Sequence, residues 1–531
     1  MKLLLKASQD RYDCRLVYQI LLVLLGVLIL VGLFRCSTIR ADYDDMRCLG
    51  FIGEKHSHEI DASPWGLQYG SDDESALDYA AELGVKWTRL EASWAEIEHA
   101  YGEYDWSLTD KAFAGALNRG ITPFITINGS HQLYCRPYTS KDAGLAEIYG
   151  SRPGPPTNTP EAMHAWLAFV RALVERYNKL IKYWEIWNEP NHFAYWGAEP
   201  DAIEYGRMVR EAATLIKQID PQAVVIAGST AGLDPKFVDG FLQMGAAHLI
   251  DKITFHNYSP LPEERIYKAV EVRKVIDRYN PSISLWQGEC GSPSHSSTRD
   301  YRGISPWGLN IQAKWLLRQA FTDVYFCGAQ VSVYFKLVDT GRRGVRPQRS
   351  FLTSIDSVLG FPQRNGFRVK SVGVNEKCLL NNPDLTPKPA YYAYQNLCAL
   401  MDGRYKAFKT DFNIDIKDVG VFYGIGREDD AFPSIPLMAS FRSEGGAALL
   451  AYWLPWHPQE IIRPAKVDIR IANFAFQEPV LVDLLTGKVY QLADFDIKDQ
   501  YVIFKNIPLS DYPLTIAERK EIRIIPIRKF K

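Results

Sequence analysis

The stretch 183–191 reads YWEIWNEPN and joins an apolar segment to a charged one. Its aromatic and β-branched residues suit a half-buried β-strand. Pro190 cannot continue a strand ladder, so Asn188 and Glu189 are predicted to lie where the strand ends. Because aromatic residues crowd Glu189 in the sequence, we expect partial desolvation to raise its pKa towards the range of a general acid. The alternative is a surface loop in which Glu189 is simply solvated.

Strand-like and helix-like segments alternate on both sides of this stretch, from about residue 63 to residue 400. The predicted strands cover 63–68, 85–90, 121–127, 183–187, 223–227, 253–255, 283–287 and 330–335. Such alternation predicts βα units around a parallel sheet, and eight of them predict an α/β fold of the (β/α)8 TIM-barrel type. An open doubly wound sheet is the alternative, but no glycine-rich phosphate loop follows the first strand.

The pattern changes after about residue 402. Short apolar runs then follow one another at 447–454, 467–471, 480–485, 488–492 and 501–504, and Thr486-Gly487 is a hairpin signal between two of them. This spacing predicts a β-sandwich at 402–531, after a barrel at 39–401. We expect the sandwich to support the barrel; independent carbohydrate binding is the alternative.

The N-terminal segment 1–38 contains an apolar run at 16–34, preceded by Lys2, Lys6, Arg11 and Arg15. A helix needs about 20 apolar residues to span a bilayer, and basic residues favour the cytoplasmic side. The segment therefore predicts a transmembrane anchor with an extracytoplasmic catalytic domain. A cleaved signal peptide is the alternative, although Phe34-Arg35-Cys36 lacks the small residues of a cleavage site.

The composition limits the partners. A net charge of −1 gives no electrostatic argument for nucleic-acid binding, so none is expected. The eight cysteines show no metal-ligand spacing, so no metal and no cofactor are predicted. The 13 Trp, 29 Tyr and 25 Phe match the flat faces of sugars, but core packing must account for most of them. The sequence does not predict the oligomeric state.

Candidate site residues follow from the predicted barrel, because chemistry in this fold lies at the C-terminal ends of the strands. Glu189 ends the fourth predicted strand and Glu289 ends the seventh. Two carboxylates that flank a bound group meet the requirement for glycoside hydrolysis, in which one acid protonates the leaving oxygen and the other carboxylate either attacks or activates water. The residues predicted to bind the substrate beside them are Arg89, Asn128, His131, Trp187, Asn188, His256, Tyr258 and Tyr334.

The segment Trp187-Asn188-Glu189-Pro190-Asn191 resembles the acid/base motif of glycoside hydrolase clan A, in the form common in family 39. The resemblance implies retaining hydrolysis of a polysaccharide or oligosaccharide at β-glycosidic bonds. It also implies that Asn188 contacts the sugar 2-hydroxyl, that Arg89 lies near the nucleophile Glu289, and that His256 and Tyr258 bind the sugar and orient the nucleophile.

Two segments depart from the family 39 pattern. The sequence QGECG at 287–291 is more similar to family 5, and Tyr334-Phe335 stands where many clan members have a tryptophan. Two alternative functions remain. The barrel could only bind glycans at the cell surface, or it could transfer the glycosyl unit to another sugar.

Overall fold

The structure of the protein is a computed structural model that describes residues 43, 46–69, 74–295, 307–340, 375–417, 435–458 and 464–527. The predicted membrane anchor at 16–34 lies outside these residues. Within the described ranges, no helix has both the length and the apolar character needed to cross a membrane.

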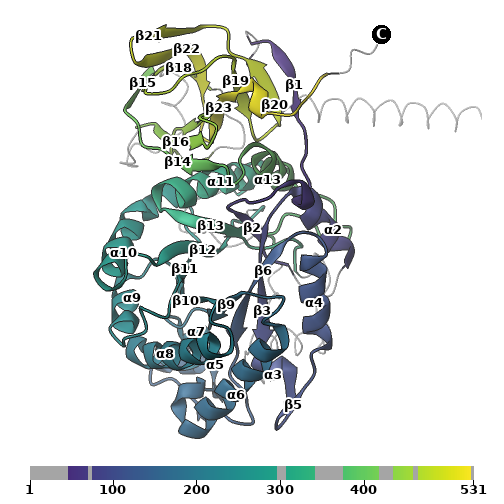
Figure 1. Cartoon of the computed structure of the whole chain (residues 1–531), viewed down its shortest axis with the longest axis vertical. Helices are drawn as coiled ribbons and strands as arrows, with labels where there is room; N and C mark the ends of the chain where they lie inside the picture. Colours follow the sequence, from purple (N-terminus) through teal and green to yellow (C-terminus); the bar gives the residue numbers. More distant parts are fainter. Residues whose placement is uncertain are drawn as a thin grey trace, which may run out of the picture.

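Eight parallel strands close into a barrel, and helices surround it (Figure 1). This confirms the predicted TIM barrel and excludes the open sheet. Each strand pairs with the next one along the chain, and the last pairs with the first. The strands are β2 (Trp65–Leu67), β3 (Trp87–Ser93), β6 (Thr122–Asn128), β9 (Tyr183–Ile186), β10 (Val224–Ala231), β11 (Lys252–His256), β12 (Ser284–Cys290) and β13 (Ala329–Tyr334).

The helices around the barrel begin and end where local sequence signals place them. Helix α6 begins at Pro160, and the Thr159 hydroxyl accepts a hydrogen bond from the backbone N–H of Ala162 at 3.0 Å, which caps its first turn. The long helices of the ring are α2 (Glu74–Leu83), α4 (Ser107–Leu117), α6 (Pro160–Tyr177), α8 (Ala202–Ile219), α9 (Pro235–Leu242), α10 (Ile266–Tyr279), α11 (Leu309–Phe321) and α13 (Pro389–Leu400).

The barrel interior changes from apolar to polar along the strands. An apolar cluster fills its lower part and comprises Phe124, Ile226, Trp286, Val331 and Val333. Since strand side chains alternate between faces, inward positions recur every two residues along a strand. Two residues beyond Trp87, Phe124 and Tyr183, which pack in this cluster, stand the polar residues Arg89, Thr126 and Glu185, towards the end of the barrel where the substrate-binding loops of this fold emerge.

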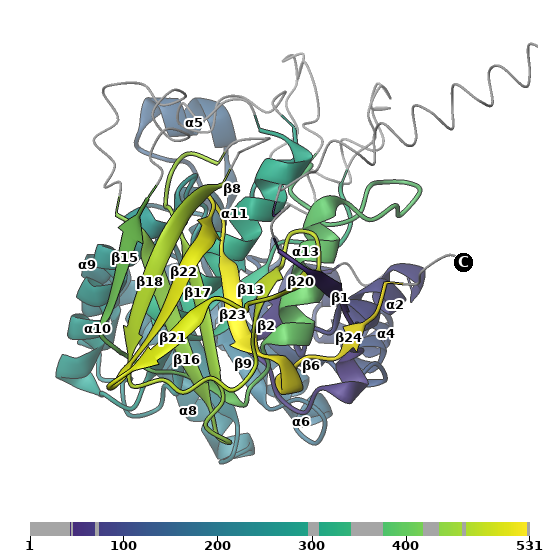
Figure 2. The same ribbon diagram turned by 90° about the horizontal axis from the view of Figure 1, so that it is seen from above.

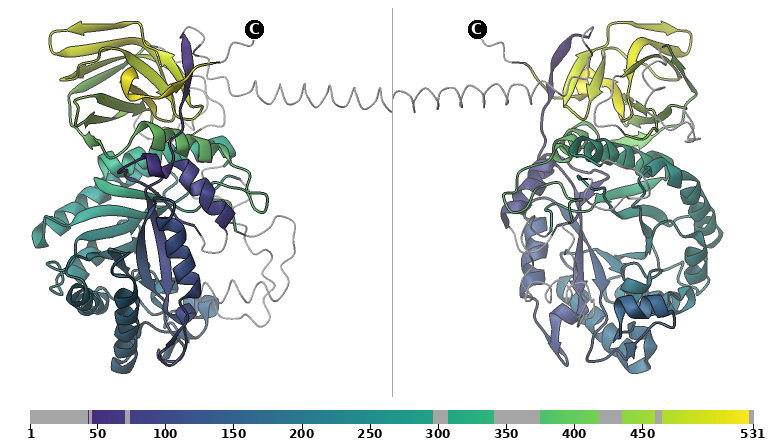
Figure 3. Two further views of the ribbon diagram at one scale, coloured as in Figure 1. Left: turned by 45° about the vertical axis from the view of Figure 1, so that its right-hand side comes forward. Right: turned by 180° about the vertical axis from the view of Figure 1, so that it is seen from behind.

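The C-terminal domain consists of two antiparallel sheets, which confirms the predicted sandwich (Figures 2 and 3). The predicted hairpin at Thr486-Gly487 joins two adjacent strands, and Gly487 adopts a left-handed φ of 72°. The larger sheet contains β14 (Tyr405–Ala407), β16 (Leu437–Ser443), β17 (Ala448–Trp453), β23 (Leu514–Glu518), β19 (Pro479–Asp483), β20 (Lys488–Gln491), β1 (Cys48–Ile52) and β24 (Ile524–Ile525). The smaller contains β15 (Phe412–Ile416), β18 (Ala465–Ala472), β22 (Tyr501–Leu509) and β21 (Phe495–Lys498).

One strand of the larger sheet comes from the other end of the chain. Strand β1 pairs with β20 and β24, with Cys48 opposite Tyr490 and Phe51 opposite Ile525. The predicted barrel domain at 39–401 therefore includes a strand that belongs to the sandwich. This pairing was not predictable from the sequence, because pairing between such distant segments leaves no local pattern.

Candidate active site

A tight turn at the end of β9 carries Asn188 and Glu189. Trp187 and Glu189 both have left-handed backbone conformations, with φ of 71° and 45°. Such conformations cost about 1–3 kcal/mol each in residues other than glycine and persist only where the surroundings impose them. Here the neighbouring strands do so, because the N–H of Trp187 donates to Ile127 O at 3.0 Å and that of Glu189 to Ser229 O at 2.9 Å.

Glu189 is buried, with 8% of its surface exposed, and bonds to a histidine. Its Oε1 lies 2.8 Å from Nδ1 of His256, and Nε2 of His256 lies 3.2 Å from the Ser229 hydroxyl. Burial acts to raise the pKa of Glu189, but the hydrogen bond and charge of His256, with His192 and Arg89, outweigh it and hold the pKa below its usual value. The expectation of a raised pKa is therefore wrong, since the sequence did not reveal these partners.

Glu289, at the end of β12, is held by three donors. Its Oε2 accepts from Arg89 Nη1 at 3.1 Å and from Gln68 Nε2 at 3.4 Å, and its Oε1 accepts from the Tyr258 hydroxyl. Burial and the charge of Glu289 raise the pKa of Tyr258 well above its usual value, so the phenol keeps its proton and remains a donor. These contacts fix the position of the Glu289 carboxylate.

The two carboxylates approach each other closely. One oxygen of Glu189, one oxygen of Glu289 and a ring nitrogen of His256 all lie within 4.8 Å of one another. Such a set has the ligand atoms to hold a metal ion. However, the donors on Glu289 include the permanent cation of Arg89, which would repel a metal ion at the same oxygen.

A buried glutamate below the site organises Arg89. Glu185, an inward-facing residue of β9, accepts from Arg89 Nε at 2.7 Å, from Thr126 Oγ1 at 2.6 Å and from the hydroxyl of Thr254. Sequence reasoning missed Glu185, although a charged residue inside an apolar strand indicates a buried partner. Arg89 thereby connects the floor of the site to Glu289.

Asn188 is also attached to Arg89, whose Nη2 donates to Asn188 Oδ1 at 2.8 Å. The same Nη2 donates to Ser229 Oγ at 3.0 Å. In the described part of the chain, the amide nitrogen of Asn188 has no protein acceptor, so this group is left to donate to a bound molecule. The structure thus brings together Arg89, Asn188, Glu189, His256, Tyr258 and Glu289 from the predicted set.

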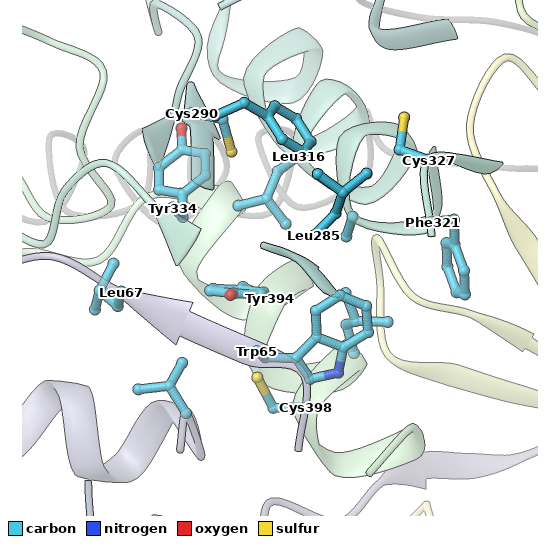
Figure 4. Packing of buried hydrophobic residues seen from close by; sticks show 14 of the residues in the cluster. Trp65, Leu67, Leu285, Cys290, Leu316, Phe321, Cys327, Tyr334, Tyr394 and Cys398 are labelled. Atoms are coloured by element: carbon cyan, nitrogen blue, oxygen red, sulfur yellow. The ribbon is translucent and has the colours of Figure 1, made fainter. Parts of the chain in front are cut away.

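Trp187 and Tyr334 do not line the site. Trp187 is 0% exposed and packs against Trp166 and Trp196, and Tyr334 is 3% exposed (Figure 4). The Tyr334 hydroxyl donates to Lys377 O at 2.8 Å, behind the barrel wall. Their predicted role in substrate binding is therefore wrong, because neither side chain can reach a ligand. Tyr334 follows the inward-facing Val333, so strand alternation directs it outwards.

Asn128 and His131 form their hydrogen bonds with neighbouring residues of the protein, and within the described residues none of these bonds reaches Glu189 or Glu289. Asn128 Nδ2 donates to Glu91 Oε1 at 2.7 Å. His131 is buried, with Nε2 2.8 Å from Glu98 O and Nδ1 accepting from the backbone N–H of Leu133 at 3.1 Å. Both ring nitrogens of His131 are thus used within the protein, which agrees with a histidine that stabilises its loop.

Two further side chains lie beside Tyr258 and were not among the predicted site residues. The ring of Phe335, half-buried, lies 6.3 Å from that of Tyr258, and Lys377 Nζ lies 4.5 Å from the Tyr258 ring centroid. Burial lowers the pKa of Lys377, although the charges of Glu289 and Glu189 oppose this. Lys377 comes from the segment after β13, and no sequence pattern pointed to it.

No protein-family model and no curated protein sequence matches the chain. Solved structures do match it. A family 39 glycoside hydrolase from the gut symbiont Bacteroides cellulosilyticus WH2 is 17% identical, with a TM-score of 0.60 over 88% of this chain and 83% of that chain. A family 30 endoxylanase from Clostridium papyrosolvens C71 is 11% identical, with a TM-score of 0.54 over 88% and 97%.

A third match is the family 39 enzyme from Xanthomonas axonopodis pv. citri, which is 17% identical, with a TM-score of 0.51 over 90% of this chain and 99% of that chain. These neighbours are clan A glycoside hydrolases. At such identities the likeness is one of fold. It confirms, at that level, the resemblance to clan A and to family 39 that the motif at 187–191 indicated.

Proposed function

We propose that the protein is a retaining glycoside hydrolase that cleaves β-glycosidic bonds of a polysaccharide or oligosaccharide. One observation carries the proposal: oxygens of Glu189 and Glu289 lie within 4.8 Å of each other. Retaining enzymes place their two carboxyl groups about 5–5.5 Å apart, whereas inverting enzymes need about 6.5–9.5 Å to admit a water molecule. The spacing here suits direct attack by one carboxylate.

In the first step, Glu289 attacks the anomeric carbon and forms a glycosyl ester, while Glu189 gives its proton to the departing oxygen. Arg89, Tyr258 and Gln68 hold Glu289 for this attack. In the second step, Glu189 accepts a proton from water as the water oxygen attacks the anomeric carbon, and Glu289 leaves as a carboxylate. Both side chains end the cycle in their starting states.

Glu189 must carry a proton when it acts as the acid. The contact of 2.8 Å between Glu189 and His256 favours the ionised carboxylate. Glycosidic oxygen binding beside Glu189 would favour the state in which the carboxyl carries that proton, which is the state required for an acid.

We also propose a substrate class and a cellular location. The family 30 neighbour is named as an endoxylanase, so xylan and its oligosaccharides are the first substrates to try. We place the catalytic domain outside the cytoplasm, anchored by the apolar run at 16–34.

Replacement of Glu289 tests the proposal. We expect Glu289→Gln to reduce hydrolysis of activated aryl glycosides on the order of 10⁵-fold, as removal of a covalent nucleophile does. Azide should restore turnover in Glu289→Gly and give a glycosyl azide of inverted anomeric configuration, detected by NMR. Glu264→Gln, at an exposed carboxylate, is the control. Near-normal activity in Glu289→Gln would refute the assignment.

A further inference from the structure

One face of helix α11 contacts both the β-sandwich and the loop 257–263, which follows β11 and is called the active-site loop below. Trp315 Nε1 donates to the backbone oxygen of Ser259 at 2.8 Å, and Arg318 donates through Nε and Nη2 to the two oxygens of Glu263, at 2.7 and 2.8 Å. Lys314, on the same helix, pairs with Asp511 of the sandwich at 3.0 Å. Figure 1 shows α11 between the barrel strands and the sandwich.

A sandwich side chain also bonds directly to the active-site loop. Trp453, the last residue of β17, donates its indole N–H to Glu263 Oε1 at 2.7 Å. Arg318 Nη1 donates to the backbone oxygen of Trp456, in the segment after β17. Glu263, Arg318 and Trp453 are all buried. The carboxylate of Glu263 therefore joins the barrel helix, the active-site loop and the sandwich.

The loop that Glu263 terminates carries Tyr258. It begins after His256 at the end of β11 and enters the short helix η3 (Pro262–Arg265). Within it, the backbone N–H of Asn257 donates to Glu289 O at 3.0 Å, and the Tyr258 hydroxyl donates to the Glu289 carboxylate. One end of this loop is thus fixed by the barrel strand, and the other end by the contacts of Glu263.

We propose that Glu263 is a positioning residue through which the β-sandwich holds Tyr258 against the nucleophile Glu289. The inference rests on the proposed function, and it extends that function by making the accessory domain part of the catalytic apparatus. A displacement of about 1 Å in a positioning group can reduce a rate about 100-fold, so loosening the far end of this loop is expected to reach the chemistry.

The variant Trp453→Phe tests this inference because it removes one indole N–H and retains an aromatic ring. Tyr452→Phe is the matched control. Tyr452 is buried in the same strand and donates to Pro508 O at 2.9 Å within the sandwich, so its loss removes a comparable bond that does not reach Glu263. A difference between the two variants isolates the connection to Glu263 from general destabilisation.

We expect Trp453→Phe to lower kcat/KM about tenfold, the kinetic equivalent of one lost buried hydrogen bond. The loss should fall on kcat, even with an activated leaving group. Tyr452→Phe should stay within roughly twofold of the unmodified protein. Glu263→Gln, which leaves Arg318 without its anion, should exceed the effect of Trp453→Phe.

Hydrogen exchange of peptides covering 257–263 gives a readout independent of turnover. Exchange there should be faster in Trp453→Phe and unchanged in Tyr452→Phe. Equal exchange and equal kinetics in the two variants would overturn the inference. If the unmodified protein hydrolyses no glycoside, the proposed function fails by itself, while the exchange comparison still decides whether Trp453 fixes the loop.

Discussion

Glu189 and Glu289 are chemically identical side chains in the same barrel mouth, yet their surroundings differ. Glu189 is the more buried, and its hydrogen-bond partner is the ring nitrogen Nδ1 of His256 at 2.8 Å. The side chain of Glu289 is 17% exposed and is held by the permanent charge of Arg89 and by the protonated phenol of Tyr258. The hydrogen-bond partners, more than the depth of burial, therefore suit Glu189 to proton transfer and Glu289 to nucleophilic attack.

Replacement of Glu189, the carboxylate assigned to proton transfer, should have the largest effect. Glu189→Gln removes the acid, so kcat/KM for a glycoside with a poor leaving group should fall on the order of 10²–10⁴-fold. Substrates with dinitrophenol as leaving group need no protonation, so their first step should be nearly unaffected. Steady-state and single-turnover kinetics on both substrate types measure this. An equal loss on both would mean that Glu189 is not the acid.

Removal of the histidine should have a smaller effect. In His256→Phe, Glu189 loses its hydrogen bond to His256, so burial is opposed mainly by the charges of His192 and Arg89 and the pKa of Glu189 rises. An acid acts below its pKa, so the basic limb of the kcat/KM profile should move to higher pH. At the original optimum, kcat/KM should fall roughly tenfold. A basic limb that stays in place would show that His256 does not control the proton of Glu189.

Replacement of a third carboxylate should have the smallest effect of the three. Asp323, in the short helix η4 (Thr322–Phe326), is fully buried and accepts hydrogen bonds from Ser332 and Gln319, and burial raises its pKa from 3.8 to about 8. The protonated form stabilises the fold, so this contribution is present below about pH 4 and is lost as the pH rises to about 8, by up to about 1.4 kcal/mol per pH unit. Asp323→Asn should flatten this decline.

Denaturant unfolding at pH 4 and pH 8 measures that effect. The difference in free energy of unfolding between the two pH values should be smaller in Asp323→Asn than in the unmodified protein. Asp415→Asn, at an exposed position of the sandwich, should leave the difference unchanged. If Asp323→Asn retains the full decline, burial of Asp323 is not its cause.

The fold was predictable because it leaves local patterns. Strand and helix segments alternate through the barrel, and Pro190 marks the end of β9, so the positions of Glu189 and Glu289 followed from chain order. Sequence position alone misplaced Trp187 and Tyr334, since closeness to a strand end does not say which face a side chain occupies. For Tyr334, the alternation with the inward-facing Val333 contained the answer.

The electrostatics of the site depend on contacts between distant segments, which a sequence does not display. Gln68 and Lys377 reach Glu289 and Tyr258 from opposite ends of the barrel domain. The lowered pKa of Glu189 depends on His256 and could not be deduced from the aromatic residues around Glu189 alone. Glu185 is different, because a charged residue inside an apolar strand is visible in the sequence, and this signal could have identified it as a buried site residue.

Strand β1 has a consequence for how the protein is made. It leaves the ribosome before the barrel, yet its partners β20 and β24 are among the last segments to be synthesised. The larger sandwich sheet can therefore close only after nearly the whole chain has emerged. A gene shortened after the barrel would leave β1 with an unpaired edge, which is a site for aggregation. Barrel and sandwich are thus expected to be inherited and lost together, and not exchanged as separate modules.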